Sequence, residues 1–150
     1  MPNDNAKATF AAGCFWGVQK HFDSMTGVLK TAVGYTGGHV DKPSYEQVCS
    51  GTTGHVEAIE IIFDPEKITY AVLLNEFFKI HDPTTLNRQG PDIGSQYRSA
   101  IFTHTKEQQQ CALSAIASHP QHDCVVTQVV PANEFHPAEE YHQKYIEKKS

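Results

Sequence analysis

The chain has 150 residues, of which 39% are hydrophobic and 19% charged, and its formal net charge is −5. This balance predicts one globular domain over 1–150. The negative charge argues against a nucleic-acid-binding protein, and no apolar run reaches the ~18 residues of a membrane-spanning helix. The polar first ten residues lack a secretory signal, so we expect a cytoplasmic protein that binds neither nucleic acid nor membrane. The four cysteines form no compact disulfide framework, and we expect reduced thiols.

Strand and helix patterns alternate along the chain, which predicts a sheet covered by helices. In the first half we expect strands over 7–12, 28–35 and 56–63, a helix that starts just after Cys14, and a short helix over 45–49.

In the second half, Thr69 is placed to cap a helix over 70–81, and the polar residues 82–97 predict a long loop. Further expected elements are a strand over 98–103, a helix from the capping box at 105–108 to before Pro120, a strand over 125–130 that begins near Cys124, and a terminal helix over 138–148.

Cys14 is the first candidate functional residue. It follows Gly13 at the predicted start of a helix, where free N–H groups and the helix dipole favour an anion. Such a position lowers the pKa of a thiol and raises its nucleophilic thiolate fraction. Trp16, the only tryptophan, lies off the apolar stripe of this helix and beside the thiol. The alternative is a buried structural cysteine next to a packing aromatic residue.

Glu57 is the second candidate. In an extended strand it shares one face with three apolar residues, because side chains alternate with a period of two. Desolvation on that face would raise the pKa of the carboxyl and suit it to general acid catalysis. The alternative is a solvated, ionised carboxylate at the end of the strand. Glu60 lies on the opposite face, and the sequence assigns it no partner.

Several longer motifs accompany these two residues. They are Gly13-Cys14-Phe15-Trp16-Gly17, Gly34-Tyr35-Thr36-Gly37-Gly38, Tyr45-Glu46-Gln47-Val48-Cys49-Ser50-Gly51, Gly54-His55-Val56-Glu57, Phe63-Asp64-Pro65, His81-Asp82-Pro83-Thr84, Asp92-Ile93-Gly94-Ser95-Gln96-Tyr97-Arg98-Ser99 and Pro137-Ala138-Glu139-Glu140-Tyr141-His142-Gln143. In this order the motifs resemble the type A peptide methionine sulfoxide reductases over nearly the whole chain.

The resemblance implies an α+β fold, a two-layer α/β sandwich with a mixed sheet flanked by helices and a ferredoxin-like core. It also implies thiol-dependent reduction of methionine S-sulfoxide, protein-bound or free, as repair after oxidative stress. Cys14 would attack the sulfur and become a sulfenic acid while Glu57 supplies a proton. Tyr45 and Tyr97 match positions that hold the sulfoxide oxygen, and the matched pocket residues are Phe15, Trp16 and Asp92.

The route by which Cys14 is reduced again departs from better-known members of the family. Many of them carry resolving cysteines after the terminal helix, whereas this chain stops at Ser150 without one. Cys111 falls on an apolar helix stripe, Cys124 has no predicted proximity to Cys14, and Cys49 is not at the usual resolving position. We therefore expect a one-cysteine enzyme with no bound cofactor or metal, reduced by thioredoxin, by glutaredoxin with glutathione, or by a small thiol.

Other interpretations stay open. A Cys/His hydrolase could pair Cys14 with one of the nine histidines. A metal-binding module could use His119, His122 and Cys124, although these lack a typical zinc spacing. We expect a monomer. His136 stands where the resembled family often has tyrosine, which leaves the local shape of the pocket rim undetermined.

Overall fold

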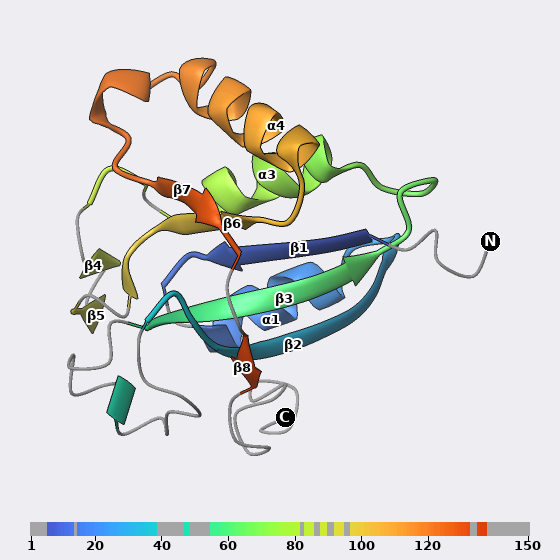
Figure 1. Ribbon diagram of the computed structural model, residues 1–150, viewed down its shortest axis with the longest axis horizontal. Coiled ribbons are helices and arrows are strands. Elements are labelled where there is room, and N and C mark those ends of the chain that lie inside the picture. Colours follow the sequence, from blue (N-terminus) through green and yellow to red (C-terminus); the bar gives the residue numbers. More distant parts are fainter. Residues whose placement is uncertain are drawn as a thin grey trace.

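One mixed sheet of six strands organises the computed structural model (Figure 1). The structure describes residues 6–13, 15–38, 47–48, 55–81, 83–85, 88–89, 92–94, 97–132 and 135–137, and of residues 15–17, 88–89, 92–93, 122 and 137 only the backbone. The sheet strands are β1 (Ala6–Ala11), β2 (Val28–Thr36), β3 (Val56–Phe63), β6 (Ala100–Thr103), β7 (Gln128–Pro131) and β8 (His136–Pro137), in the spatial order β7-β6-β1-β3-β2-β8.

The four central strands form the core of the fold. Strand β3 lies between β1 and β2 and is antiparallel to both, and β6 is antiparallel to β1. With helices after β1 and β3, this is the β-α-β-β-α-β arrangement of ferredoxin-like folds. Strand β7 joins parallel to β6, and β8 joins antiparallel to β2. The predicted mixed sheet and ferredoxin-like core are confirmed.

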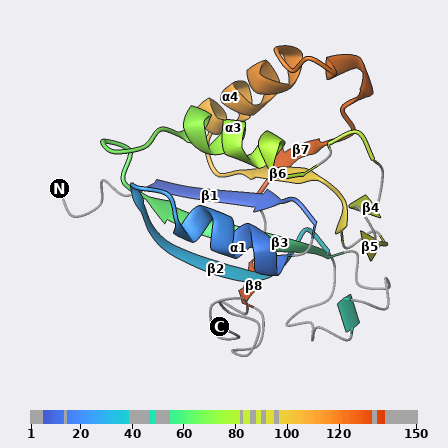
Figure 2. The ribbon, with the colours of Figure 1, turned by 180° about the vertical axis from the view of Figure 1, so that it is seen from behind.

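The helices α1 (Phe15–Asp23), α3 (Tyr70–Lys79) and α4 (Lys106–Ala117) share one hydrophobic core with one face of the sheet. Figure 2 shows α1 in front of β2 and β3. This confirms two layers, with alternate strand residues directed toward the helices. The most deeply buried members of this core include Phe10, Phe22, Val33, Tyr35, Ile59, Ile61, Leu73, Leu74, Phe77 and Ile101. No helix in the described ranges is long and apolar enough to cross a membrane.

Both predicted helix caps are present. The Thr69 hydroxyl accepts a hydrogen bond from the Val72 N–H at 3.2 Å, and the Thr105 hydroxyl accepts one from the Gln108 N–H at 3.1 Å. Each bond satisfies an N–H group that has no partner inside its helix. These caps fix where α3 and α4 begin.

The structure corrects several boundaries in the second half. The predicted loop 82–97 contains a small hairpin of β4 (Arg88–Gln89) and β5 (Asp92–Ile93). Strand β6 begins two residues later than expected, and β7 runs over Gln128–Pro131.

Cys124 does not begin a strand. It ends a short 3-10 helix, His122–Cys124, because its N–H turns back to the Gln121 carbonyl at 2.8 Å. The edge strand β8 was not predicted, and the expected helix over 138–148 lies outside the described residues. Of the expected helix over 45–49, Gln47 and Val48 are described and are helical.

Candidate functional site

One end of the sheet gathers the chain segments that carry the predicted site. Strand β1 ends there, while β3 and β6 begin there, at the left of Figure 1. Phe10 pairs with Ile59, and Ala11 pairs with Ala100. Because both pairs are antiparallel, continuing these registers brings the residue after Ala11 level with Glu57. The end of β1 therefore lies between the beginnings of β3 and β6.

Glu57 is buried at this end, with a relative exposure of 1%. It pairs with Tyr35 of β2 in the sheet, and it shares the helix-facing side of β3 with Ile59 and Ile61. The expected desolvation of this carboxyl is confirmed.

The helix that follows Cys14 is anchored firmly to the sheet. Gly13 adopts a φ of 94°, which glycine reaches without strain, and α1 begins at Phe15 as predicted. Gln19 is fully buried, and its amide donates to the Thr31 hydroxyl at 3.2 Å. That hydroxyl donates in turn to the Asp23 carboxylate at 2.5 Å. Helix α1 is thus tied to β2 from its second turn onward.

The remaining predicted site residues are described to different extents. Cys14 and Tyr45 lie outside the described residues. Phe15 and Trp16 belong to the first turn of α1, and Asp92 belongs to β5, but only their backbones are described. Tyr97 is partly buried, and its N–H donates to the Gly94 carbonyl at 3.0 Å. It stands three positions before Ala100, the residue that pairs with the end of β1.

Two buried histidines lie at the same end: His136, which stands where the resembled family often has tyrosine at the pocket rim, and His55, which was not singled out from the sequence. His55 accepts a hydrogen bond at Nδ1 from the Gly38 N–H at 3.0 Å. Its ring lies edge-on to His136, with the centroids 5.1 Å apart. His136 pairs with Tyr35, which pairs with Glu57, so these three residues share one rung across β8, β2 and β3. For His55, its two-residue spacing from Glu57 was the one available signal.

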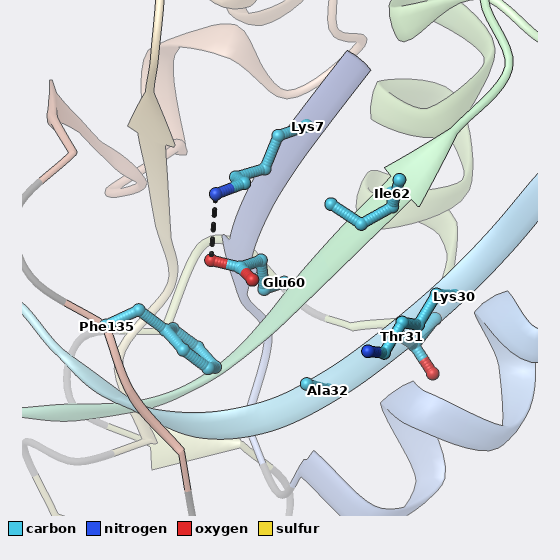
Figure 3. Close-up of a pocket in the computed structure, with 7 residues that line it drawn as sticks. All are labelled: Lys7, Lys30, Thr31, Ala32, Glu60, Ile62 and Phe135. Carbon is cyan, nitrogen blue, oxygen red and sulfur yellow. Dashed lines mark ion pairs between the residues drawn. The ribbon is translucent and has the colours of Figure 1, made fainter. Parts of the chain in front are cut away.

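Glu60 has a partner that the sequence did not reveal. Its carboxylate lies 3.7 Å from the Lys7 ammonium of β1. Both residues border a pocket of about 330 Å³ (Figure 3), whose other lining residues are Lys30, Thr31, Ala32, Ile62 and Phe135. Because neighbouring strand residues alternate in direction, Glu60 and Glu57 occupy opposite faces of β3. This pocket is therefore separate from the candidate site.

The other thiols differ in their surroundings. Cys111 of α4 is half-buried beside the main core, and burial raises the pKa of its thiol. Cys124 is exposed. Among the described residues, no three histidine, cysteine, aspartate or glutamate side chains gather as a metal ion would require.

Comparisons with known proteins agree on one family. A family model described as peptide methionine sulfoxide reductase matches residues 6–150. A peptide methionine sulfoxide reductase MsrA of Methanosarcina acetivorans is 55% identical over 95% of this chain and 78% of its own length. The corresponding protein of Acidobacterium capsulatum is 54% identical over 96% of this chain and 95% of its own length.

Solved structures give the same result. Reduced Mxr1 from Saccharomyces cerevisiae is 36% identical and covers 99% of this chain and 87% of its own, with a TM-score of 0.91. Methionine sulfoxide reductase A of Corynebacterium diphtheriae is 33% identical and covers 97% of this chain and 76% of its own, with a TM-score of 0.88. The fold and the sequence motifs therefore lead to the same family.

Proposed function

The chain belongs to the peptide methionine sulfoxide reductase family, type A, and we propose that it reduces methionine S-sulfoxide with Cys14 as nucleophile and Glu57 as general acid. The observation that carries this assignment is the burial of Glu57 at the end of the sheet where β1 leads into α1. A protonated carboxyl is required close to the nucleophile, and burial favours that protonation state.

The chemistry follows from the weak electrophilicity of a sulfoxide sulfur. Glu57 donates a proton to the sulfoxide oxygen, and the Tyr45 and Tyr97 phenols donate hydrogen bonds to it. The Cys14 thiolate then attacks the sulfur. The substrate sulfur is reduced by two electrons and leaves as methionine. The oxygen and its proton pass to the Cys14 sulfur as the S–S bond formed by the attack breaks, so Cys14 is oxidised by two electrons to a sulfenic acid.

The substrate pocket needs an apolar contact for the S-methyl group beside these donors. Phe15 and Trp16 are proposed for that contact because the first turn of α1 follows Cys14 directly. Asp92 is proposed to shape the same pocket. Free methionine sulfoxide and sulfoxide in oxidised proteins share this chemical group, and both are proposed substrates.

The test is an assay of both sulfoxide epimers with dithiothreitol as reductant. Wild-type protein should reduce the S epimer, and Cys14→Ser should abolish the reaction while remaining folded. Cys124→Ser is the matched control, because it removes an exposed thiol from the 3-10 helix and should leave turnover unchanged. Near-native turnover by Cys14→Ser would refute the assignment. A hydrolase would instead need an imidazole base and would retain activity in Glu57→Gln.

For the return step we propose an external thiol, such as thioredoxin, glutaredoxin with glutathione, or a small thiol. The two thiols described in the structure are Cys111, which is half-buried on α4, and Cys124, which is exposed on the 3-10 helix. Reduced protein treated with excess substrate in the absence of reductant should retain three free thiols and a trappable sulfenic acid. An internal disulfide from Cys14 to Cys49, Cys111 or Cys124 in good yield would overturn this proposal.

A further inference from the structure

Three side chains and one carbonyl form a hydrogen-bonded series next to the candidate site, referred to below as the Ser99 chain. Nδ1 of His81 lies 2.5 Å from the Phe77 carbonyl oxygen. Nε2 of the same ring lies 2.7 Å from the Ser99 hydroxyl, which lies 2.7 Å from the Thr127 hydroxyl. Ser99 is 2% exposed, so bulk water cannot take over these bonds.

The Phe77 carbonyl at one end fixes the direction of every hydrogen bond in the Ser99 chain when the His81 ring is neutral. A carbonyl oxygen only accepts, so Nδ1 of His81 carries the proton. Nε2 of the neutral ring is then an acceptor and receives the Ser99 O–H. The Ser99 oxygen in turn accepts from Thr127. Each group therefore has one role in the series, and removing one hydroxyl breaks the series at that point.

The Ser99 chain joins three segments that are distant in sequence. His81 follows α3, Ser99 precedes β6, and Thr127 precedes β7. Further bonds connect the same segments, since the Val126 N–H donates to the Pro83 carbonyl at 2.8 Å. Figure 1 shows β6 and β7 side by side above β1.

Tyr97 lies on the segment that this network holds. Its own N–H is bound to the Gly94 carbonyl at 3.0 Å, and Ser99 follows two residues later. Between them, Nε of Arg98 donates to the Gln128 side-chain oxygen at 3.1 Å, and the Ser99 carbonyl accepts from the Gln128 N–H at 3.2 Å. The backbone of Tyr97 is therefore fixed from both sides.

We propose that the Ser99 chain positions Tyr97 for hydrogen bonding to the sulfoxide oxygen. This inference rests on the proposed function, because it assumes that the Tyr97 phenol is an oxygen donor. A donor contributes only when it is aimed at the place where charge develops, and small displacements of such groups reduce rates steeply. Ser99, His81 and Thr127 are positioning residues and do not themselves contact substrate.

The test is a double-mutant cycle on kcat/KM for methionine S-sulfoxide. Ser99→Ala removes both hydroxyl bonds, and Thr127→Val removes the outer one while keeping the side-chain shape. Thr103→Val is the matched control. Its hydroxyl donates to the Val130 carbonyl at 3.4 Å and so also joins β6 to β7, but at the end of β6 away from Tyr97. Each variant is made in wild-type and in Tyr97→Phe protein, and thermal unfolding is recorded for all.

We expect Ser99→Ala to lower kcat/KM about tenfold and Thr127→Val a few-fold in the wild-type background. Neither should lower it further once Tyr97 is phenylalanine, whereas their loss of thermal stability should persist in both backgrounds. Thr103→Val should leave kcat/KM unchanged. If Ser99→Ala does not fold, Thr127→Val alone decides.

Equal losses of kcat/KM in both backgrounds would refute positioning through Tyr97 while leaving the proposed function intact. Unchanged kcat/KM in Ser99→Ala and Thr127→Val would refute it as well. If Tyr97→Phe by itself has no effect, the donor role of Tyr97 fails, and the positioning inference fails with it.

Discussion

Replacing Glu57 by glutamine separates proton donation from packing. Glutamine has the same shape and can still form hydrogen bonds, but it cannot donate a proton to a developing oxyanion. The carboxyl is 1% exposed, so solvent has no direct route to replace it. General acids typically contribute 10²- to 10⁴-fold, and we expect Glu57→Gln to slow the chemical step by ~10²-fold or more. This corresponds to about 2.7 kcal/mol or more in activation free energy.

The same strand supplies a control for this substitution. Glu60→Gln makes an identical change three residues away, on the opposite face of β3, where the carboxylate pairs with Lys7. It should leave the chemical rate unchanged, because an ion pair of this kind contributes little to stability and lies away from the site. The two variants together distinguish loss of an acid from a general effect of removing a carboxylate from β3.

The assay is a single turnover in which sulfenic acid formation is followed after mixing reduced enzyme with substrate. Circular dichroism establishes that each variant is folded. Alkylation of Cys14 should proceed at the wild-type rate in Glu57→Gln, because the thiolate does not depend on this carboxyl. Sulfenic acid formation by Glu57→Gln at the wild-type rate would show that Glu57 is not the acid.

Three further predictions concern the pocket and the stability of the fold. Trp16→Ala should lower kcat/KM by about 1–3 kcal/mol of lost apolar contact, and an unchanged value would place Trp16 outside the pocket. Tyr70 has a buried hydroxyl with no hydrogen-bond partner in the described structure, and burial raises its pKa. Tyr70→Phe should therefore raise the free energy of unfolding in urea by about 1 kcal/mol, whereas a decrease would reveal a partner. Burial lowers the pKa of His104, so in acid the unfolded state binds more protons and stability should fall as the pH drops below ~6.5. His104→Gln should flatten that slope, and an unaltered slope would assign it to other groups.

Local sequence patterns were sufficient to predict those helices and strands that are determined by their own residues. The alternation in β3 predicted both the strand and the burial of Glu57. Thr69 and Thr105 predicted where α3 and α4 begin, because a cap is a bond to a residue three positions away. Glycine before Cys14 and helical spacing after it likewise predicted the start of α1.

Features that depend on partners distant in sequence had no local signal. Strand β8 has two residues, one of them proline, and it forms because Gly34 of β2 leaves room for its backbone. A Cβ at Gly34 would lie 2.3 Å from the His136 carbonyl oxygen. The ion pair of Glu60 with Lys7 and the contact between His55 and His136 similarly require strands to be in register.

The placement of Glu57 relative to the proposed nucleophile likewise depends partly on a local pattern and partly on strand pairing between distant segments. Alternation along β3 assigns Glu57 to the helix-facing side, but it does not say which other segment lies near it. Antiparallel pairing of β1 with β3 supplies that second fact, because it brings the end of β1 to the beginning of β3. The β1–β6 pairing brings the segment of Tyr97 to the same place. A one-residue change of the β1–β3 register would shift Glu57 relative to Gly13 and turn the apolar side chains of one strand away from the core. The packing of Phe10 against the helices therefore fixes the register on which the proposed acid and nucleophile depend.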